Sequence, residues 1–104
     1  LKLTQHFPSD AIHRAKELLA AMPGGTGCYS HSAGVEAIRK DVAKFIEHRD
    51  GFPCDHDDLF LSNGASPAIQ NVLNSLIRGP TDGIMIPIPQ YPLYTASIAL
   101  FGGT

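Results

Sequence analysis

Apolar residues recur at helical spacing in three stretches of the chain. Each stretch carries apolar side chains three and four residues apart, which places them on one face of a helix. Charged residues fill the opposite faces, and in the second stretch we assign Arg39 to this solvated face. The three predicted helices span residues 9–21, about 35–48, and 68–77.

Turn and capping residues bound these helices. Ser9 or Asp10 is the predicted N-cap of the first helix, and Asp50-Gly51 ends the second. Ser66 is the predicted N-cap of the third, with Pro67 at its first helical position.

Two shorter apolar runs, residues 59–62 and 84–88, have the length and composition of buried strands. A further apolar helical pattern follows the second run. The order helix, helix, strand, helix, strand, helix predicts an α/β fold with a mostly parallel sheet. We expect the two strands to be parallel neighbours joined by a right-handed helical crossover.

A small-residue turn, Gly64-Ala65-Ser66, lies between the first predicted strand and the third helix. The first amides of a helix lack intrahelical partners and carry partial positive charge, so such a turn can bind an anion. Glycine and alanine let a phosphate approach the backbone closely, and the Ser66 hydroxyl can donate. The alternative interpretation is an ordinary capped turn without a ligand.

The run IPIPQYPLY, residues 86–94, follows the second predicted strand and stiffens the chain around Tyr91 and Tyr94. Ligands of open α/β sheets bind beyond the carboxyl ends of strands, where both this run and the Gly64 turn would lie. A flat aromatic cofactor with a phosphate fits that pairing, with Tyr91 stacked on its ring. The alternative is that both tyrosines only fill the core.

Composition excludes several other classes. The net charge is −2 and the cations are scattered, so no nucleic-acid surface is expected, and the apolar runs are too short to cross a membrane. Cys28 and Cys54 are isolated, which predicts an intracellular, reducing compartment without a disulfide. No phosphate-binding P-loop or dinucleotide fingerprint is present. Residues 54–58 are interpreted as a solvated acidic loop, so no metal is predicted.

Three motifs in order carry a resemblance to a known family: CYSHSAGVEAIRKDVAKFIEHRDG, DLFLSNGASPAI and GIMIPIPQYPLYTASIALFGGT. Together they resemble the alanine aminotransferases, fold-type I enzymes that depend on pyridoxal 5'-phosphate. The resemblance implies a three-layer αβα fold, with residues 1–104 forming the N-terminal part of the cofactor-binding large domain. We therefore expect the chain to be a piece of a larger protein whose remainder is absent.

The resemblance also implies roles for individual residues. Gly64, Ala65 and Ser66 match the turn that binds the cofactor phosphate, and Tyr91 matches the aromatic residue that stacks on the ring. Tyr29 matches a tyrosine that reaches the phosphate of the neighbouring subunit in a homodimer. The Schiff-base lysine of the family lies in a downstream segment absent here, so no catalytic residue is assigned. The chain alone is expected to be inactive.

The function implied by the resemblance is amino-group transfer between L-alanine and 2-oxoglutarate, giving pyruvate and L-glutamate. A glutamate:glyoxylate aminotransferase is the alternative among enzymes that use amino-acid and 2-oxo-acid substrates. The alternative that is not an enzyme is a non-catalytic domain that binds a phosphorylated ligand or a partner. Cytosol, mitochondrion and peroxisome all keep thiols reduced, so the two isolated cysteines do not distinguish among these compartments.

Overall fold

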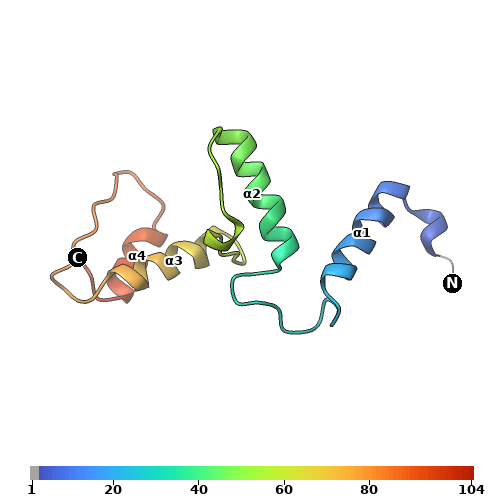
Figure 1. The fold of residues 1–104 in the computed structure, drawn as a ribbon. Coiled ribbons are helices and arrows are strands. Elements are labelled where there is room, and N and C mark those ends of the chain that lie inside the picture. Colours follow the sequence, from blue (N-terminus) through green and yellow to red (C-terminus); the bar gives the residue numbers. More distant parts are fainter. Residues whose placement is uncertain (1–2) are drawn as a thin grey trace. The chain divides into compact units, whose positions relative to one another are not determined.

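A computed structural model describes residues 3–104 (Figure 1), and these residues form two compact units that meet in sequence between Leu61 and Ser62. The elements in chain order are η1 (Leu3–His6), α1 (Ser9–Ala21), α2 (Glu36–Asp50), η2 (His56–Asp58), α3 (Ala65–Leu76) and α4 (Leu93–Leu100).

The first unit contains the two predicted amphipathic helices. The bounds of α1 are those the sequence predicts, although its N-cap is Pro8 and not Ser9 or Asp10. The prediction that α2 ends at Asp50-Gly51 is confirmed, because Gly51 adopts a left-handed φ of 76° and its N–H donates to Glu47 O. A C-terminal glycine in this conformation is a common way to stop a helix.

One side-chain assignment on α2 is wrong. Arg39 is not solvated but buried, with only 5% of its surface exposed, whereas Phe45 is exposed. Arg39 lies four residues after Val35 and three before Val42, so it shares the apolar stripe of the helix. The inward face therefore includes a cation, whose partners are described below.

The second unit is built from α3 and α4, which contact each other (Figure 1). Leu73 and Ile77 from the α3 region pack with Ile98 of α4, and partly buried residues surround this core: Ile69, Ile84, Ile86 and Phe101. The apolar pattern of α3 also predicts Val72 and Leu76 on its inward face, but both are more than half exposed.

The two predicted strands are not formed within residues 3–104. The backbone at Leu59 is extended, with φ −102° and ψ 130°, but residues 59–62 and 84–88 are not hydrogen-bonded to each other. A strand requires a laterally paired neighbour, and extended backbone without one is not a sheet. The prediction of two paired strands is therefore not confirmed in this structure, where only the backbone at Leu59 is shown to be extended.

One pair of backbone hydrogen bonds does follow the parallel pattern. Thr104 N donates to Asp82 O (3.1 Å), and Thr104 O accepts from Ile84 N (2.7 Å). Thr104 thus hydrogen-bonds to both neighbours of Gly83, which is the repeating pattern between two parallel strands. Residues 82–84 can thus pair in the orientation that the sequence predicts for a sheet.

Candidate functional site

The Gly64 turn at the start of α3 has a backbone conformation restricted to glycine. Gly64 has φ 99° and ψ 175°, a region that residues with a Cβ essentially do not populate. A Cβ built on Gly64 would have no heavy atom within 4 Å. The turn is therefore strained for any other residue and open on the side where a Cβ would point.

The amides at this helix start are available to a ligand. Within the described chain, no side chain caps α3, and the Ser62 hydroxyl donates instead to Gly64 O (2.7 Å). Gly64 is the N-cap and Ala65 the first helical residue, so the prediction of Ser66 as N-cap and Pro67 as first residue is wrong. Pro67 still fits, because first-turn amides have no intrahelical acceptor and its missing N–H costs nothing.

Ser66 consequently has its hydroxyl free of a capping role. It is the second residue of α3, which begins at Ala65. The partial positive charge of a helix N-terminus favours anions near its first amides. Backbone N–H groups, a hydroxyl and a helix dipole therefore occur together in this turn and suit a phosphate.

Tyr91 lies in the same unit as the Gly64 turn and leaves 64% of its surface exposed. Its carbonyl accepts from Tyr94 N (3.2 Å), which fixes the short turn before α4. Nothing in the described chain hydrogen-bonds Tyr91 to the Gly64 turn. An exposed ring on a proline-bounded turn is available for stacking on a flat ligand.

Tyr94 has a different environment. It is half-buried and lines an apolar groove of about 590 Å³ between α3 and the extended segment before Pro89. The lining is almost wholly apolar: Ala68, Ile69, Val72, Leu73, Ile84, Met85, Ile86 and Pro87 join Tyr94. The packing role expected for Tyr94 agrees with this placement.

Tyr29 lies in the first unit, in the segment between α1 and α2, and its side chain is fully exposed. It borders an open hollow of about 520 Å³, together with His31 and the end of α1. A tyrosine without a packing partner in its own unit is free to contact another molecule.

Arg39, which the sequence pattern placed on the solvated face of α2, forms hydrogen bonds to two other segments of the first unit. Arg39 Nη1 donates to His56 O (2.6 Å) and to Asp57 Oδ1 (3.1 Å), and Nε donates to Gly34 O (3.3 Å). The hydrogen bond from Arg39, with a smaller contribution from the charge of His56, lowers the pKa of Asp57 below its ordinary value of 3.8. A charged residue on the apolar stripe of a helix was the signal for this site.

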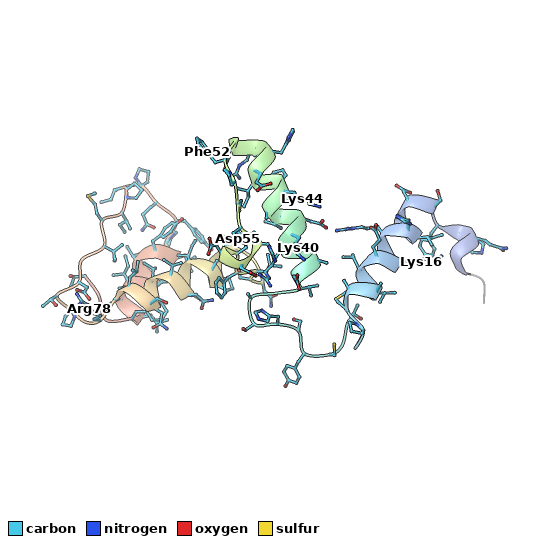
Figure 2. All side chains as sticks on the ribbon, in the orientation of Figure 1. Lys16, Lys40, Lys44, Phe52, Asp55 and Arg78 are labelled. Atoms are coloured by element: carbon cyan, nitrogen blue, oxygen red, sulfur yellow. The ribbon has the colours of Figure 1, made fainter. Side chains whose placement is uncertain are left out.

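The acidic loop around η2 is organised by its own backbone. Asp55, labelled in Figure 2, caps η2 by accepting from Asp57 N (2.9 Å). Among residues 3–104, no three His, Cys, Asp or Glu side chains are grouped to hold a metal ion.

Lysines are confined to the first part of the sequence. Figure 2 shows Lys16 on α1 and Lys40 and Lys44 on α2, whereas no lysine follows residue 44. Lys2 lies outside the described residues. The unit that carries the Gly64 turn therefore offers no amine to a carbonyl-bearing cofactor.

These residues fit pyridoxal 5'-phosphate in part. The open Gly64 turn, the uncapped amides and the Ser66 hydroxyl suit its phosphate, and the exposed Tyr91 ring suits its pyridine. The second unit, which carries these residues, contains no lysine.

A family model and several known proteins match this chain. The model of the family "Aminotransferase class I and II" matches residues 1–104. Glutamate--glyoxylate aminotransferase 2 of Arabidopsis thaliana is 55% identical over 98 residues, which are 94% of this chain and 20% of that protein. Alanine aminotransferase 2 of Panicum miliaceum is 54% identical over 99 residues, again 94% of this chain and 20% of that protein.

A solved structure matches as well. Alanine aminotransferase from Pyrococcus furiosus has a TM-score of 0.73 at 27% sequence identity, covering 88% of this chain and 23% of that chain. The chain therefore spans about a fifth of the length of the relatives it matches. No helix within residues 3–104 is long and apolar enough to cross a membrane.

Proposed function

Because the chain belongs to the family of class I and II aminotransferases, we propose that it supplies the phosphate and ring-stacking contacts of a pyridoxal-phosphate-dependent aminotransferase. The observation that carries this proposal is the start of α3. There, a glycine-only turn opens onto free space beside amides that no side chain caps. The 104 residues provide binding and orientation for a full-length enzyme that contains them.

Each residue has a defined task in this proposal. The amides of Gly64 and Ala65 and the hydroxyl of Ser66 hold the phosphate, while Tyr91 fixes the plane of the ring. When bound, the cofactor supplies an electron sink for amino-group transfer. Tyr29 extends from the first unit toward the phosphate of a second subunit, which makes the full-length enzyme a homodimer. Its complete exposure within this chain supports that role.

The proposed reaction transfers the amino group between L-alanine and 2-oxoglutarate, giving pyruvate and L-glutamate. Transfer between glutamate and glyoxylate is the second candidate, favoured by the relative of that name at 55% identity. Initial rates of the full-length enzyme on three substrate pairs, alanine with 2-oxoglutarate, glutamate with glyoxylate and alanine with glyoxylate, discriminate the two candidates.

We also expect the sheet to form in the full-length enzyme. Both predicted strands are mainly apolar, the backbone at Leu59 is extended, and the bridge between Gly83 and Thr104 has parallel geometry. Strands from the remainder of the protein would supply the missing partners and give the three-layer αβα large domain. Both cysteines are free thiols, which suits an intracellular, reducing compartment.

The proposed site predicts how three variants of the full-length enzyme bind cofactor. Ser66→Ala removes a hydrogen bond to a charged phosphate, worth roughly 1.5–3 kcal/mol. Tyr91→Ala removes the stacking face, worth roughly 0.5–1.5 kcal/mol. Both should raise the dissociation constant for pyridoxal 5'-phosphate, by a few-fold to about a hundredfold.

Tyr94→Ala is the matched control, because Tyr94 lines the apolar groove. It should lower the melting temperature and leave cofactor affinity nearly unchanged. Dissociation constants are measured from the visible absorbance of the bound cofactor. Since Ser66 does not cap α3, Ser66→Ala should also leave the melting temperature of the apoenzyme nearly unchanged. Parental affinity in both Ser66→Ala and Tyr91→Ala would place the cofactor elsewhere.

A further inference from the structure

Arg39 joins two separate segments of the first unit through one buried guanidinium. Nε donates to the carbonyl of Gly34, at the end of the segment that carries Tyr29. Nη1 donates to the carbonyl of His56 and to the carboxylate of Asp57, both in η2. The side chain itself is 6% exposed. A single cation thus ties the segment before α2 to the segment after it.

A second set of contacts joins the same segment to Leu61, the last residue of the first unit. Leu61 N donates to Ala33 O (2.9 Å). The Leu61 side chain lies directly against Gly34, since a Cβ built there would come within 2.7 Å of Leu61 Cδ1. Only Ser62 and Asn63 separate Leu61 from Gly64 in the sequence. The residues that lead into the phosphate turn are therefore fixed to the end of the Tyr29 segment.

The chemistry of this contact requires arginine. A buried cation is costly unless its donors are satisfied, and here three acceptors surround the planar fork. A lysine ammonium is a point charge on a flexible stem and cannot serve carbonyls on two segments and a carboxylate with the same geometry. Removal of the guanidinium would leave the Gly34 and His56 carbonyls without this donor and free the segments to move apart.

We propose that Arg39 is a positioning residue for cofactor binding, which it serves without touching the cofactor. It holds the Tyr29 segment at Gly34 and the lead-in to the phosphate turn at His56–Leu61 in a fixed register. This inference rests on the proposed function, because the residues it positions are those proposed to bind the phosphate. Small displacements of a positioned group have large effects: a shift of 1 Å can lower the rate of a catalysed reaction about a hundredfold.

The test compares four variants of the full-length enzyme. Arg39→Met keeps the aliphatic volume and removes the donors, Arg39→Lys keeps the charge, and Ser66→Ala reports on the phosphate site itself. Arg49→Met is the control, since Arg49 lies on the same helix but is exposed and pairs with Asp50. The measurements are the dissociation constant for pyridoxal 5'-phosphate, the melting temperatures of apo- and holoenzyme, and the visible circular dichroism of the bound cofactor.

We expect Arg39→Met to raise the dissociation constant about tenfold, equivalent to roughly 1.4 kcal/mol. The gain in melting temperature on cofactor binding should shrink, and the visible circular dichroism should weaken as the ring is held less firmly. Arg39→Lys should recover only part of the affinity, and Arg49→Met should stay within about twofold of the parent on the same scale. A purely structural role would lower both melting temperatures equally and leave affinity unchanged.

Parental affinity in Arg39→Met alongside weakened affinity in Ser66→Ala would overturn the positioning role alone. Parental affinity in both would overturn the phosphate site and this inference with it. If Arg39→Met does not fold, Asp57→Asn keeps both carbonyl contacts and loses the carboxylate. It should then weaken cofactor binding about threefold, on the scale of 1.4 kcal/mol per decade, and parental affinity in that variant would overturn the proposal.

Discussion

Two glycines of this chain share a backbone conformation and differ in what surrounds them. Gly34 has φ 102° and Gly64 has φ 99°, so both adopt the positive φ that side chains disfavour. A Cβ on Gly34 would lie 2.7–2.9 Å from three atoms of Leu61, whereas a Cβ on Gly64 would have nothing within 4 Å. Gly34 is required by conformation and by packing, and Gly64 by conformation alone.

The surroundings of Gly34 account for its missing side chain. Its place is filled by Leu61, and its carbonyl is bound by Arg39. Gly64 shares its open surroundings with Gly25, Gly51 and Gly102, which also have a positive φ. What sets Gly64 apart is its position as the N-cap of a helix whose first amides no side chain caps, which is the feature that a bound phosphate would account for.

Gly34→Ala should give the largest loss of stability. The substitution imposes an unfavourable φ and forces Leu61 or the backbone to move, together roughly 3 kcal/mol. Thermal unfolding of the full-length apoenzyme measures the loss. An alanine accepted there within about 0.5 kcal/mol, the range of neutral surface changes, would show that the turn is looser than described.

A double substitution separates the two causes. Leu61→Gly removes all three atoms against which the new Cβ collides, so the cost of Gly34→Ala should be smaller in that background. The backbone term, roughly 1–3 kcal/mol, should remain. Equal costs of Gly34→Ala in both backgrounds would assign the whole effect to φ.

Gly64→Ala should have a smaller effect on stability and a specific effect on the cofactor. Only the backbone term applies, roughly 1–2 kcal/mol, since the new methyl enters open space. That methyl occupies the approach of the phosphate, so cofactor affinity should fall at least about tenfold, roughly 1.4 kcal/mol. Melting temperatures of the apoenzyme and cofactor titrations distinguish the two effects. An unchanged affinity would remove the basis for a phosphate at this turn.

The helices of this fold could be predicted from sequence because their apolar stripes and stop signals are local. The bounds of α1 and the end of α2 at Gly51 follow directly from such signals. The strands could not, because residues 59–62 and 84–88 depend on neighbours that are distant in sequence or outside the chain. The start of α3 was misassigned because Pro67 fits any first-turn position, not only the first.

The candidate site likewise contains one part that could be predicted from sequence and one that could not. The Gly64 turn was found from sequence because a strand-like run, small residues and a helix start are adjacent. Arg39 was missed because its charge was given more weight than its position on the stripe with Val35 and Val42. A buried arginine can be inferred only when its acceptors are known, and these come from residues 34 and 56–57. Local sequence patterns can therefore predict a turn, whereas a contact among three segments can be predicted only when the fold is known.

The smallest expected effect concerns the carboxylate at the Arg39 contact. The hydrogen bond from Arg39 and the charge of His56 lower the pKa of Asp57 below 3.8 in the folded state. A group with a lowered folded-state pKa stabilises the fold above its unfolded pKa, and this contribution is lost as pH falls through the folded value. Asp57→Asn should therefore reduce stability near pH 6 slightly, and the difference from the parent should shrink as pH falls below about 4, where an ordinary carboxylate begins to be protonated, and vanish only below the lowered pKa of Asp57 in the folded state. Urea unfolding followed by circular dichroism between pH 3 and 7 measures this convergence in the full-length protein. A stability difference between Asp57→Asn and the parent that stays constant over this pH range would exclude a specific Arg39–Asp57 contribution.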